Sequence, residues 1–220
     1  MTPLHDWMIS CLYSDRPSTF QDSEVISDLV SWKDIEDCIN RPWSYLPKIL
    51  DKNSDGPINL RKIKPFWFHK MVRKEEVVKH VKDGHTLQIR NYSVHNPAAN
   101  NLCNVIEEEC NISADMHVFC SKGKSSSFPA HWDDPSNFIL QVEGRTGWKV
   151  FDRIGNGIFG KVYEKEENLG PPIIDVILNP GDILYIPKMM YHKADPFEKR
   201  ISISISCAPG IPINRSHIEL

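Results

Sequence analysis

The second half of the chain contains six short apolar segments separated by turns rich in glycine and proline, and this pattern restricts the fold more than any other feature. Each segment is four to seven residues long, which is a usual length for a β-strand. Closely spaced strands of this length predict a β-sandwich or a β-barrel. The predicted strands are Met116–Cys120, Asn137–Val142, Trp148–Asp152, Ile173–Leu178, Ile183–Ile186 and Ile201–Cys207.

The last predicted strand alternates strictly between two residue types, Ile201-Ser-Ile-Ser-Ile-Ser206. Successive side chains of a strand point to opposite faces of its sheet. The isoleucines should therefore pack against an apolar outer layer, and the serines should face a polar barrel interior.

The first half of the chain shows helical patterns instead. Helix signals are apolar residues at helical spacing, an asparagine cap followed by proline, and stops at glycine or before proline. The predicted helices are 23–40, broken once and ended by Arg41-Pro42, then 74–82, and a helix that begins at Asn96-Pro97; the predicted strands are 58–63 and 86–89. Residues 1–22 lack a clear period and are expected to wrap around the surface, and residues 53–57 predict a turn.

The helix that begins at Asn96-Pro97 should pack through one apolar stripe. Its members are Leu102, Val105, Ile106 and Cys110, and Cys103 lies on the same side as Cys110. The acidic run Glu107-Glu-Glu109 near the helix end is expected to be solvated.

Composition favours one globular domain over 1–220, with 1–115 as N-terminal support, 116–208 as the barrel core and 209–220 as a tail too short to fold alone. The net charge of −3 gives no general attraction to nucleic acid or to anionic membranes. There is no apolar run of membrane-spanning length and no secretory signal pattern, so a cytoplasmic location is expected. The six cysteines have no Cys-x-x-Cys spacing, which predicts reduced thiols.

Residues 61–82 hold eight Lys or Arg against two Glu, with Phe66, Trp67 and Phe68 among them. One interpretation is a surface for nucleic acid. The favoured interpretation is an amphipathic helix over 74–82 with a solvated basic face, and aromatic side chains that pack inward.

His131 and Asp133 are the core of a possible metal site at the head of an apolar strand. Residues two apart on an extended chain point to the same side, so both could bind one cation. The predicted third ligand is His192, because its segment also has a strand followed by a turn; His95, His117 or another carboxylate are the alternatives. A His-x-Asp pair is common by chance, but two histidines and one carboxylate are the ligands of non-haem Fe(II) oxygenases.

These residues also carry a family resemblance. His131-Trp-Asp-Asp, Phe138-Ile-Leu-Gln-Val-Glu-Gly-Arg, Trp148-Lys-Val-Phe and Asn179-Pro-Gly-Asp-Ile-Leu-Tyr-Ile-Pro with His192 resemble the Jumonji-C hydroxylases, and most of all their cupin-like ribosomal oxygenases. The resemblance covers residues 115–208 and extends more weakly to residue 30. It implies a double-stranded β-helix that uses Fe(II), 2-oxoglutarate and O2, with His131, Asp133 and His192 as the metal ligands and catalytic residues.

The residues that would hold 2-oxoglutarate depart from the family. The resemblance implies a Lys or Arg fifteen residues after the first ligand, where this chain has Thr146. Arg200 and Ser202 share the phase of the inward serines, and an Arg-x-Ser binds 2-oxoglutarate in other branches of the wider superfamily. We therefore expect Arg200 to bind the distal carboxylate, with Lys149 as the alternative if the strand register differs by one residue. The assisting residues are expected to be Ser202, Thr146, Asn137 and Ser206.

The resemblance implies hydroxylation of a carbon in a protein or peptide side chain, with succinate and CO2 as co-products. A small metabolite or natural product is the second substrate class, and RNA bound through residues 61–82 is the third. The ribosomal oxygenases have a winged-helix region after the barrel that this sequence lacks, which argues against a ribosomal protein as substrate. A non-catalytic binding barrel is a further alternative. A three-His-one-Glu cupin is not favoured, because Asp133 and Asn137 stand where that site needs His and Glu. The residues do not indicate an oligomeric state.

Overall fold

The computed structural model describes residues 3–21, 23–26, 28–41, 47–51, 57–58, 60, 62–66, 69–124, 128–153 and 162–209, with the side chains of 62–66 and 69–71 left aside. Its helices are α1 (Pro3–Tyr13), α2 (Trp32–Asn40), α3 (Lys74–Lys82) and α4 (Pro97–Cys110), with 3-10 turns at Glu24–Ile26, Tyr92–Val94 and Glu166–Asn168. Its strands are β1 (Ser18–Phe20), β2 (Lys48–Leu50), β3 (Pro57–Ile58), β4 (Lys62–Phe66), β5 (His69–Val72), β6 (Thr86–Ile89), β7 (Ile112–Ser121), β8 (Ser136–Glu143), β9 (Thr146–Val150), β10 (Ile174–Leu178), β11 (Ile183–Ile186), β12 (His192–Pro196) and β13 (Arg200–Pro209).

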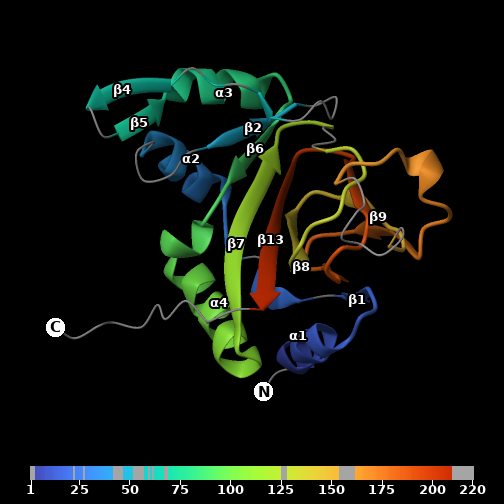
Figure 1. Cartoon of the computed structure of the whole chain (residues 1–220). Helices are drawn as coiled ribbons and strands as arrows, with labels where there is room; N and C mark the ends of the chain where they lie inside the picture. Colours follow the sequence, from blue (N-terminus) through green and yellow to red (C-terminus); the bar gives the residue numbers. More distant parts are fainter. Residues whose placement is uncertain are drawn as a thin grey trace.

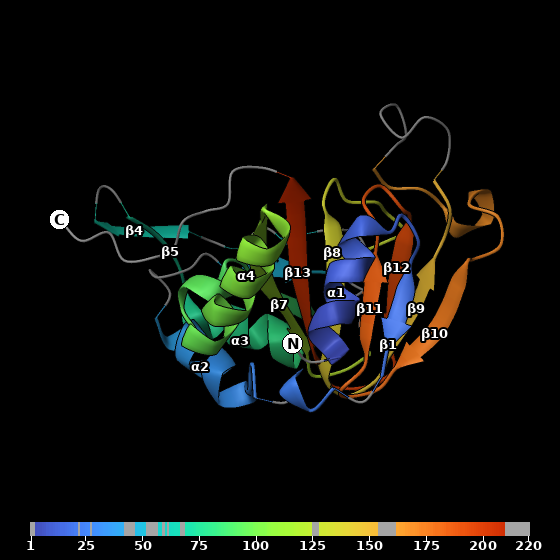
Figure 2. The same cartoon turned by 90° about the horizontal axis from the view of Figure 1, so that it is seen from below.

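Two antiparallel sheets form the barrel. The larger sheet has the order β1-β11-β8-β13-β7-β6-β2-β3, and the smaller has the order β10-β9-β12. Apolar side chains from β8 and β11 pack against those from β9 and β10 between the two sheets. Figure 2 shows β9, β10 and β12 on one side of the molecule and helices α2, α3 and α4 on the other. The predicted fold class is confirmed: a mainly β double-stranded β-helix flanked by N-terminal helices.

The long strands β7 and β13 lie at the centre of the molecule (Figure 1). Ile201, Ile203 and Ile205 of β13 are at most 1% exposed and join the core beneath the helices. On the other face, Ser202 and Ser204 line an interior cavity. The predicted alternation of isoleucine outside and serine inside is therefore confirmed.

The helix ends follow from local capping. Ser31 and Asp34 form a reciprocal capping box at the start of α2, and Arg41 closes its end. The Asn96 side chain accepts a hydrogen bond from the Ala99 amide at the start of α4, 3.0 Å away. Asn111 ends α4 in the left-handed conformation, with φ of 51°. The predicted bounds of α3 and β6 agree with the structure, and the predicted break in 23–40 lies between Ile26 and Trp32.

Three predictions for the first half of the chain were wrong. The N-terminal segment, expected to wrap around the surface, forms helix α1 and strand β1 instead. Met8 and Cys11 of α1 are buried in the core. Glu107 is 3% exposed rather than solvated, because its carboxylate accepts a hydrogen bond from the Ala114 amide at 2.8 Å. The strand predicted over 58–63 is divided between β3 and β4.

Some predictions fall outside the described residues. These are residues 53–56 of the predicted turn, the inward packing of the aromatic side chains at 66–68, and the tail from 210 onward. Among the described residues, no helix combines the length and the apolar character needed to cross a bilayer.

Candidate metal centre and co-substrate cavity

The backbones of His131 and His192 are joined directly. The His131 amide donates to the His192 carbonyl at 3.1 Å, and the His192 amide donates to the His131 carbonyl at 2.7 Å. This isolated antiparallel bridge sets the two imidazole rings 4.4 Å apart, measured between centroids. The meeting of the two histidines is thus fixed by main-chain hydrogen bonds.

The turn before His192 is also tied to the first segment. The Met189 amide donates to the Asp133 carbonyl at 2.8 Å, and Met189 has a positive φ of 62°. A residue other than glycine rarely adopts the left-handed conformation, and it needs support from its surroundings to do so. Here the support is the hydrogen bond to Asp133, which joins both halves of the site.

The orientation of both rings is set by backbone carbonyls. His131 Nδ1 lies 3.0 Å from the Pro129 carbonyl, and His192 Nδ1 lies 3.0 Å from the Met190 carbonyl. A carbonyl oxygen only accepts, so each Nδ1 carries the proton. In this tautomer a neutral imidazole presents its Nε2 lone pair to a metal, and such outer contacts orient histidine ligands in metal sites.

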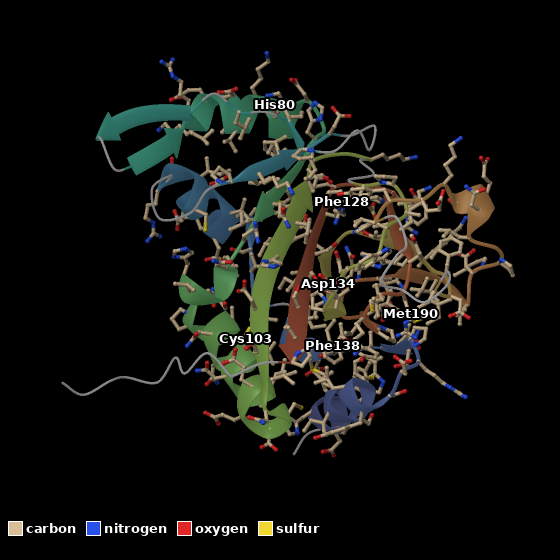
Figure 3. The ribbon with its side chains drawn as sticks, viewed as in Figure 1. His80, Cys103, Phe128, Asp134, Phe138 and Met190 are labelled. Carbon is tan, nitrogen blue, oxygen red and sulfur yellow. The ribbon has the colours of Figure 1, made fainter. Side chains whose placement is uncertain are left out.

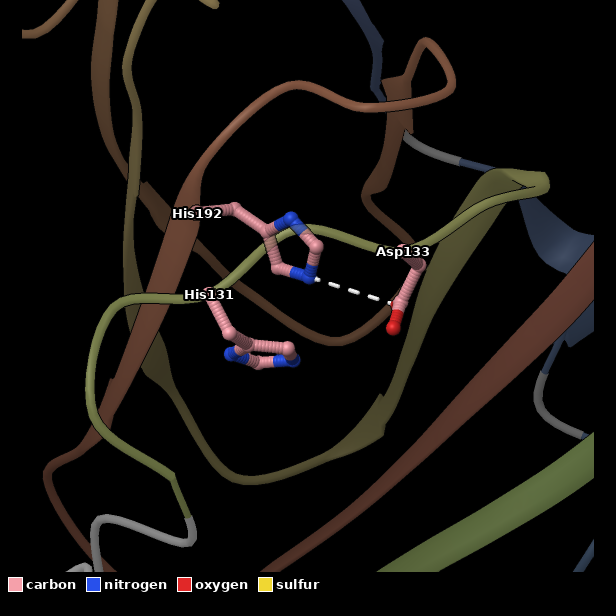
Figure 4. A group of neighbouring side chains, drawn as sticks. All are labelled: His131, Asp133 and His192. Atoms are coloured by element: carbon pink, nitrogen blue, oxygen red, sulfur yellow. Dashed lines mark ion pairs between the residues drawn. The ribbon is translucent and has the colours of Figure 1, made fainter. Parts of the chain in front are cut away.

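Asp133 completes the group (Figure 4). One ligand atom from each of His131, Asp133 and His192 lies within 4.8 Å of the other two. Asp133 Oδ2 is 3.6 Å from His192 Nε2. Among the described residues, neither His95 nor His117, the alternative third ligands, joins this group.

Asn137 forms a hydrogen bond with Asp133 and connects it to two serines. Its Nδ2 donates to Asp133 Oδ2 at 3.3 Å, while its Oδ1 accepts from the hydroxyls of Ser204 at 3.0 Å and Ser206 at 2.8 Å. Asn137 and Ser206 were predicted as 2-oxoglutarate residues. That role stays a prediction; the contact that the structure shows is with the Asp133 carboxylate, directly from Asn137 and through Asn137 from Ser206.

The electrostatics favour an uncharged His131. Its pKa is lowered to about 4, first by burial and then by the neighbouring His192, while Asp133 acts in the opposite direction. The ring is therefore neutral at pH 7, which is the form of histidine that binds metals.

Trp132, between His131 and Asp133, packs away from the triad. It is half-buried against an apolar cluster that contains Phe151, Leu169 and Tyr191. The predicted packing role agrees with this position.

A cavity opens beside the three side chains. It is lined by Phe119, Phe128, His131, Asp133, Ile139, Trp148, His192, Ala194, Arg200, Ser202, Ile203 and Ser204. In Figure 3, Phe128 and Met190 lie on the barrel side of β13, whereas Cys103 of α4 lies on the opposite side.

Arg200 brings a buried positive charge to this cavity. The residue is 2% exposed, and its Nη1 donates to the Ser202 hydroxyl at 3.1 Å. Ser202 in turn donates to Gln141 Oε1 at 3.0 Å. Burial lowers the pKa of Arg200 to about 10, so the guanidinium stays charged at neutral pH. The cavity therefore combines a potential metal site with a cation suited to an organic anion.

The side chains in β9 and just before it point either into the barrel or out of it. Thr146 is fully buried, and its hydroxyl has no hydrogen-bond partner among the described residues. Lys149 points outward and forms an ion pair with Glu166. Arg145 pairs with Glu198 on the surface at 3.0 Å. Neither cation near Thr146 in the sequence reaches the cavity lining.

Sequence reasoning missed one contact that supports the site. Arg153 binds both carboxylate oxygens of Asp15, at 2.9 and 2.6 Å. The same guanidinium donates twice to the Lys188 carbonyl, at 3.1 and 2.8 Å. Lys188 precedes Met189, so Arg153 connects the N-terminal segment to the turn before His192. Asp15 and Arg153 are far apart in the sequence, and no motif signals their contact.

Comparison with known proteins gives a consistent result. A model of the family described as JmjC domain matches residues 89–211, which is more than half of the chain. The chain is 32% identical over 130 residues to a bifunctional lysine-specific demethylase and histidyl-hydroxylase NO66 of Drosophila mojavensis, covering 56% of this chain and 14% of that protein. The Drosophila melanogaster protein of the same name is 30% identical over 133 residues, covering 56% and 20%. The match thus spans a fifth or less of these relatives.

Solved structures show the same fold. Escherichia coli ribosomal oxygenase YcfD in complex with cobalt and 2-oxoglutarate superposes with a TM-score of 0.63 at 19% identity, over 93% of this chain and 52% of that one. A second crystal structure of that ribosomal oxygenase gives a TM-score of 0.61 at 19% identity, over 89% and 49%.

Proposed function

This chain belongs to the JmjC domain family, and we propose that it is an Fe(II)- and 2-oxoglutarate-dependent oxygenase that hydroxylates a carbon of a protein or peptide side chain, with succinate and CO2 as co-products. The observation that carries the proposal is the group His131, Asp133 and His192 at the edge of a cavity that also contains the buried Arg200.

The three side chains fit a divalent metal. His131 and His192 present Nε2 because each Nδ1 is bound to a carbonyl, and Asp133 is held by Asn137. Two imidazoles and one carboxylate would occupy one side of the ion and leave positions for small-molecule ligands. We therefore assign these three residues as the metal ligands.

Arg200 and Ser202 fit the distal carboxylate of 2-oxoglutarate. The family's usual cation position is Thr146, which has no charge, whereas Arg200 lines the same cavity as the triad. A guanidinium can bind a carboxylate through two parallel hydrogen bonds. Ser202 adds a hydroxyl beside it, and Thr146 offers a second hydroxyl on the buried side of β9.

The remaining lining residues define the reaction space. When bound, Fe(II) with 2-oxoglutarate and O2 supplies the oxidising power for hydroxylation of a C–H bond. Ile139, Trp148 and Ala194 give the cavity an apolar wall that excludes bulk water. Arg200 fixes one end of the co-substrate, so that its other end is directed to the triad.

A protein substrate is favoured by the relatives. The Drosophila proteins are named as histidyl-hydroxylases and lysine-specific demethylases, and the structural neighbour as a ribosomal oxygenase. We further propose that 1–220 acts as one domain. Support comes from one apolar cluster that has members from Met8 to Cys207 and so joins the N-terminal helices to the large sheet.

The test compares two adjacent acids. Asp133→Asn should abolish Mn(II) binding and Fe(II)-dependent succinate formation, whereas Asp134→Asn, on an exposed neighbour, should leave both unchanged. Binding of 2-oxoglutarate by the wild-type protein should require the metal. Succinate formation that persists in Asp133→Asn would contradict the metal assignment. Binding of metal and 2-oxoglutarate without turnover of any peptide would favour the non-catalytic barrel.

A further inference from the structure

The inner face of the large sheet continues past the barrel onto β6 and β2. Across the sheet, Lys48 pairs with Gln88, Gln88 with Phe119, and Phe119 with Ser202. Directly opposed residues on neighbouring strands point to the same face. Lys48 and Gln88 therefore lie on the face that carries the cavity residues Phe119 and Ser202. The four residues form one row that leads away from the metal-binding triad.

This extension is close to the triad. Lys48 Nζ lies 5.7 Å from the centre of the Phe128 ring, which is itself 5.0 Å from the His131 ring. Phe128 also stacks with the half-exposed ring of Tyr163 at 6.5 Å. The aromatic pair thus stands between the extension and the cavity.

The extension is positively charged. Arg90 follows Gln88 by two residues, so it is in phase with the same face. The strand register places Lys48 opposite Gln88, and the lowered pKa of Lys48, caused first by burial and then by the charge of Arg90, agrees with two cations on one face. Neither residue forms an ion pair with a described carboxylate. Two neighbouring cations without such a partner favour the binding of an anionic group.

Gln88 adds an unmet hydrogen-bond acceptor. The residue is 8% exposed, and its Oε1 has no partner among the described residues. A buried acceptor without a donor costs about 1–3 kcal/mol. An arriving N–H group would remove this cost. This observation is independent of charge and indicates a ligand that is a donor as well as an anion.

We propose that the face formed by Lys48, Gln88 and Arg90 binds an extended acidic segment of the protein substrate next to the hydroxylated residue. A carboxylate of the segment contacts Lys48 and Arg90, and a main-chain N–H donates to Gln88 Oε1. The neighbouring side chain then passes Phe128 into the cavity. This inference rests on the proposed function and names the chemistry of its substrate.

Nucleic acid fits this face less well. Affinity for a phosphate backbone grows with the number of cations that contact it, and this face offers two. The chain as a whole carries a net charge of −3.

The experiment measures fluorescence anisotropy of labelled probes with the full chain loaded with Mn(II) and 2-oxoglutarate. The probes are a peptide of alternating glutamate and alanine, the same peptide with glutamine or with lysine in place of glutamate, and single-stranded oligouridine. The acidic peptide should bind about tenfold or more tightly than the glutamine peptide, and the lysine peptide should bind most weakly.

Three variants locate the binding. Lys48→Glu combined with Arg90→Glu should remove the preference for the acidic peptide. Gln88→Leu should weaken peptide binding about three- to tenfold, which is the contribution of one hydrogen bond. It should not lower the melting temperature, because the substitution also removes the buried acceptor that has no partner in the described part of the chain. Lys82→Glu is the matched control: it reverses an exposed charge on α3, which packs on the outer side of the same sheet, and should change nothing.

Each other outcome overturns the inference. Equal binding of the acidic and glutamine peptides, an equal loss in Lys82→Glu, or unchanged binding in Gln88→Leu would each refute it. Oligouridine binding that depends on Lys48 and Arg90 would assign the face to nucleic acid instead. A failure here with normal Mn(II) binding refutes this inference alone, whereas absent Mn(II) binding refutes the proposed function.

Discussion

The two faces of the large sheet use the same strands but differ in content. On the outer face, Ile201, Ile203 and Ile205 join one continuous apolar core with the helices. On the inner face of the same strand, Arg200, Ser202, Ser204 and Ser206 hydrogen-bond to polar side chains. Because successive residues of a strand point to opposite faces, residues that stabilise the fold alternate along β13 with residues that face the proposed site. Substitutions one residue apart should affect different measurements.

The largest expected effect is on the inner face. His131→Ala should reduce Fe(II)-dependent succinate formation about a thousandfold, corresponding to roughly 4 kcal/mol in the barrier. The fold should persist, since the bridge between His131 and His192 uses backbone groups alone. The checks are succinate yield, Mn(II) affinity and circular dichroism. If His131→Ala kept wild-type turnover but had a lowered melting temperature, the inner face would contribute to stability and not to the reaction.

The outer face should show the opposite pattern. Ile205 is fully buried, and Ile205→Ala should lower the free energy of unfolding by about 2–5 kcal/mol through lost burial and a cavity. Its Mn(II) affinity, measured well below the melting temperature, should match that of the wild type. Urea denaturation gives the first quantity. A large loss of Mn(II) affinity in the folded protein would show that the two faces are not separable.

Arg200 sharpens the comparison within the inner face. Arg200→Ala should raise the 2-oxoglutarate concentration needed for half-maximal turnover at least about tenfold, or about 1.4 kcal/mol. Lys149→Ala is the control, because Lys149 is held outside the barrel by Glu166. A shift in Lys149→Ala with none in Arg200→Ala would mean that the co-substrate uses the other side of the small sheet.

The smallest expected effect comes from a contact outside both faces. Asp15→Asn should weaken Mn(II) binding only about two- to threefold, since an exposed ion pair contributes little. The direction follows from Arg153, which would lose a partner while it holds the Lys188 carbonyl beside the turn. Isothermal titration with Mn(II) measures this change. An effect as large as that of His131→Ala would place Asp15 in the site itself.

The sequence carried enough information for the core of the fold. The alternation in Ile201–Ser206 predicted both faces of β13, and the His-x-Asp pair with a later histidine predicted which side chains meet. Their role as metal ligands stays a prediction. Strand β12 was missed because Lys193-Ala-Asp-Pro196 is largely polar and only partly covered. Its partner is supplied by β9, which no local pattern reveals.

Other misses have the same physical origin. Glu107, Glu108 and Glu109 are identical in type, and only the position of β7 decides that the first is buried. The contact between Asp15 and Arg153 depends on how the N-terminal segment returns to the sheet. The contacts of Asn137 with Ser206 and with Asp133 also join residues that no local pattern connects, and the predicted part of Asn137 and Ser206 in 2-oxoglutarate binding stays a prediction. Local sequence patterns predict which face of a strand a side chain lies on, whereas its contact partners depend on the tertiary arrangement.

The bridge between His131 and His192 bears on how the protein and its metal come together in time. Because two main-chain hydrogen bonds already hold the ligand pair, little conformational entropy is lost when an ion arrives. With the proposed ligands, we expect the chain to complete its folding first and to bind its metal afterwards, unlike small zinc domains whose folding waits for the ion. A metal-free pool of this protein would be structurally ready for loading, and its activity would follow the supply of iron without new synthesis.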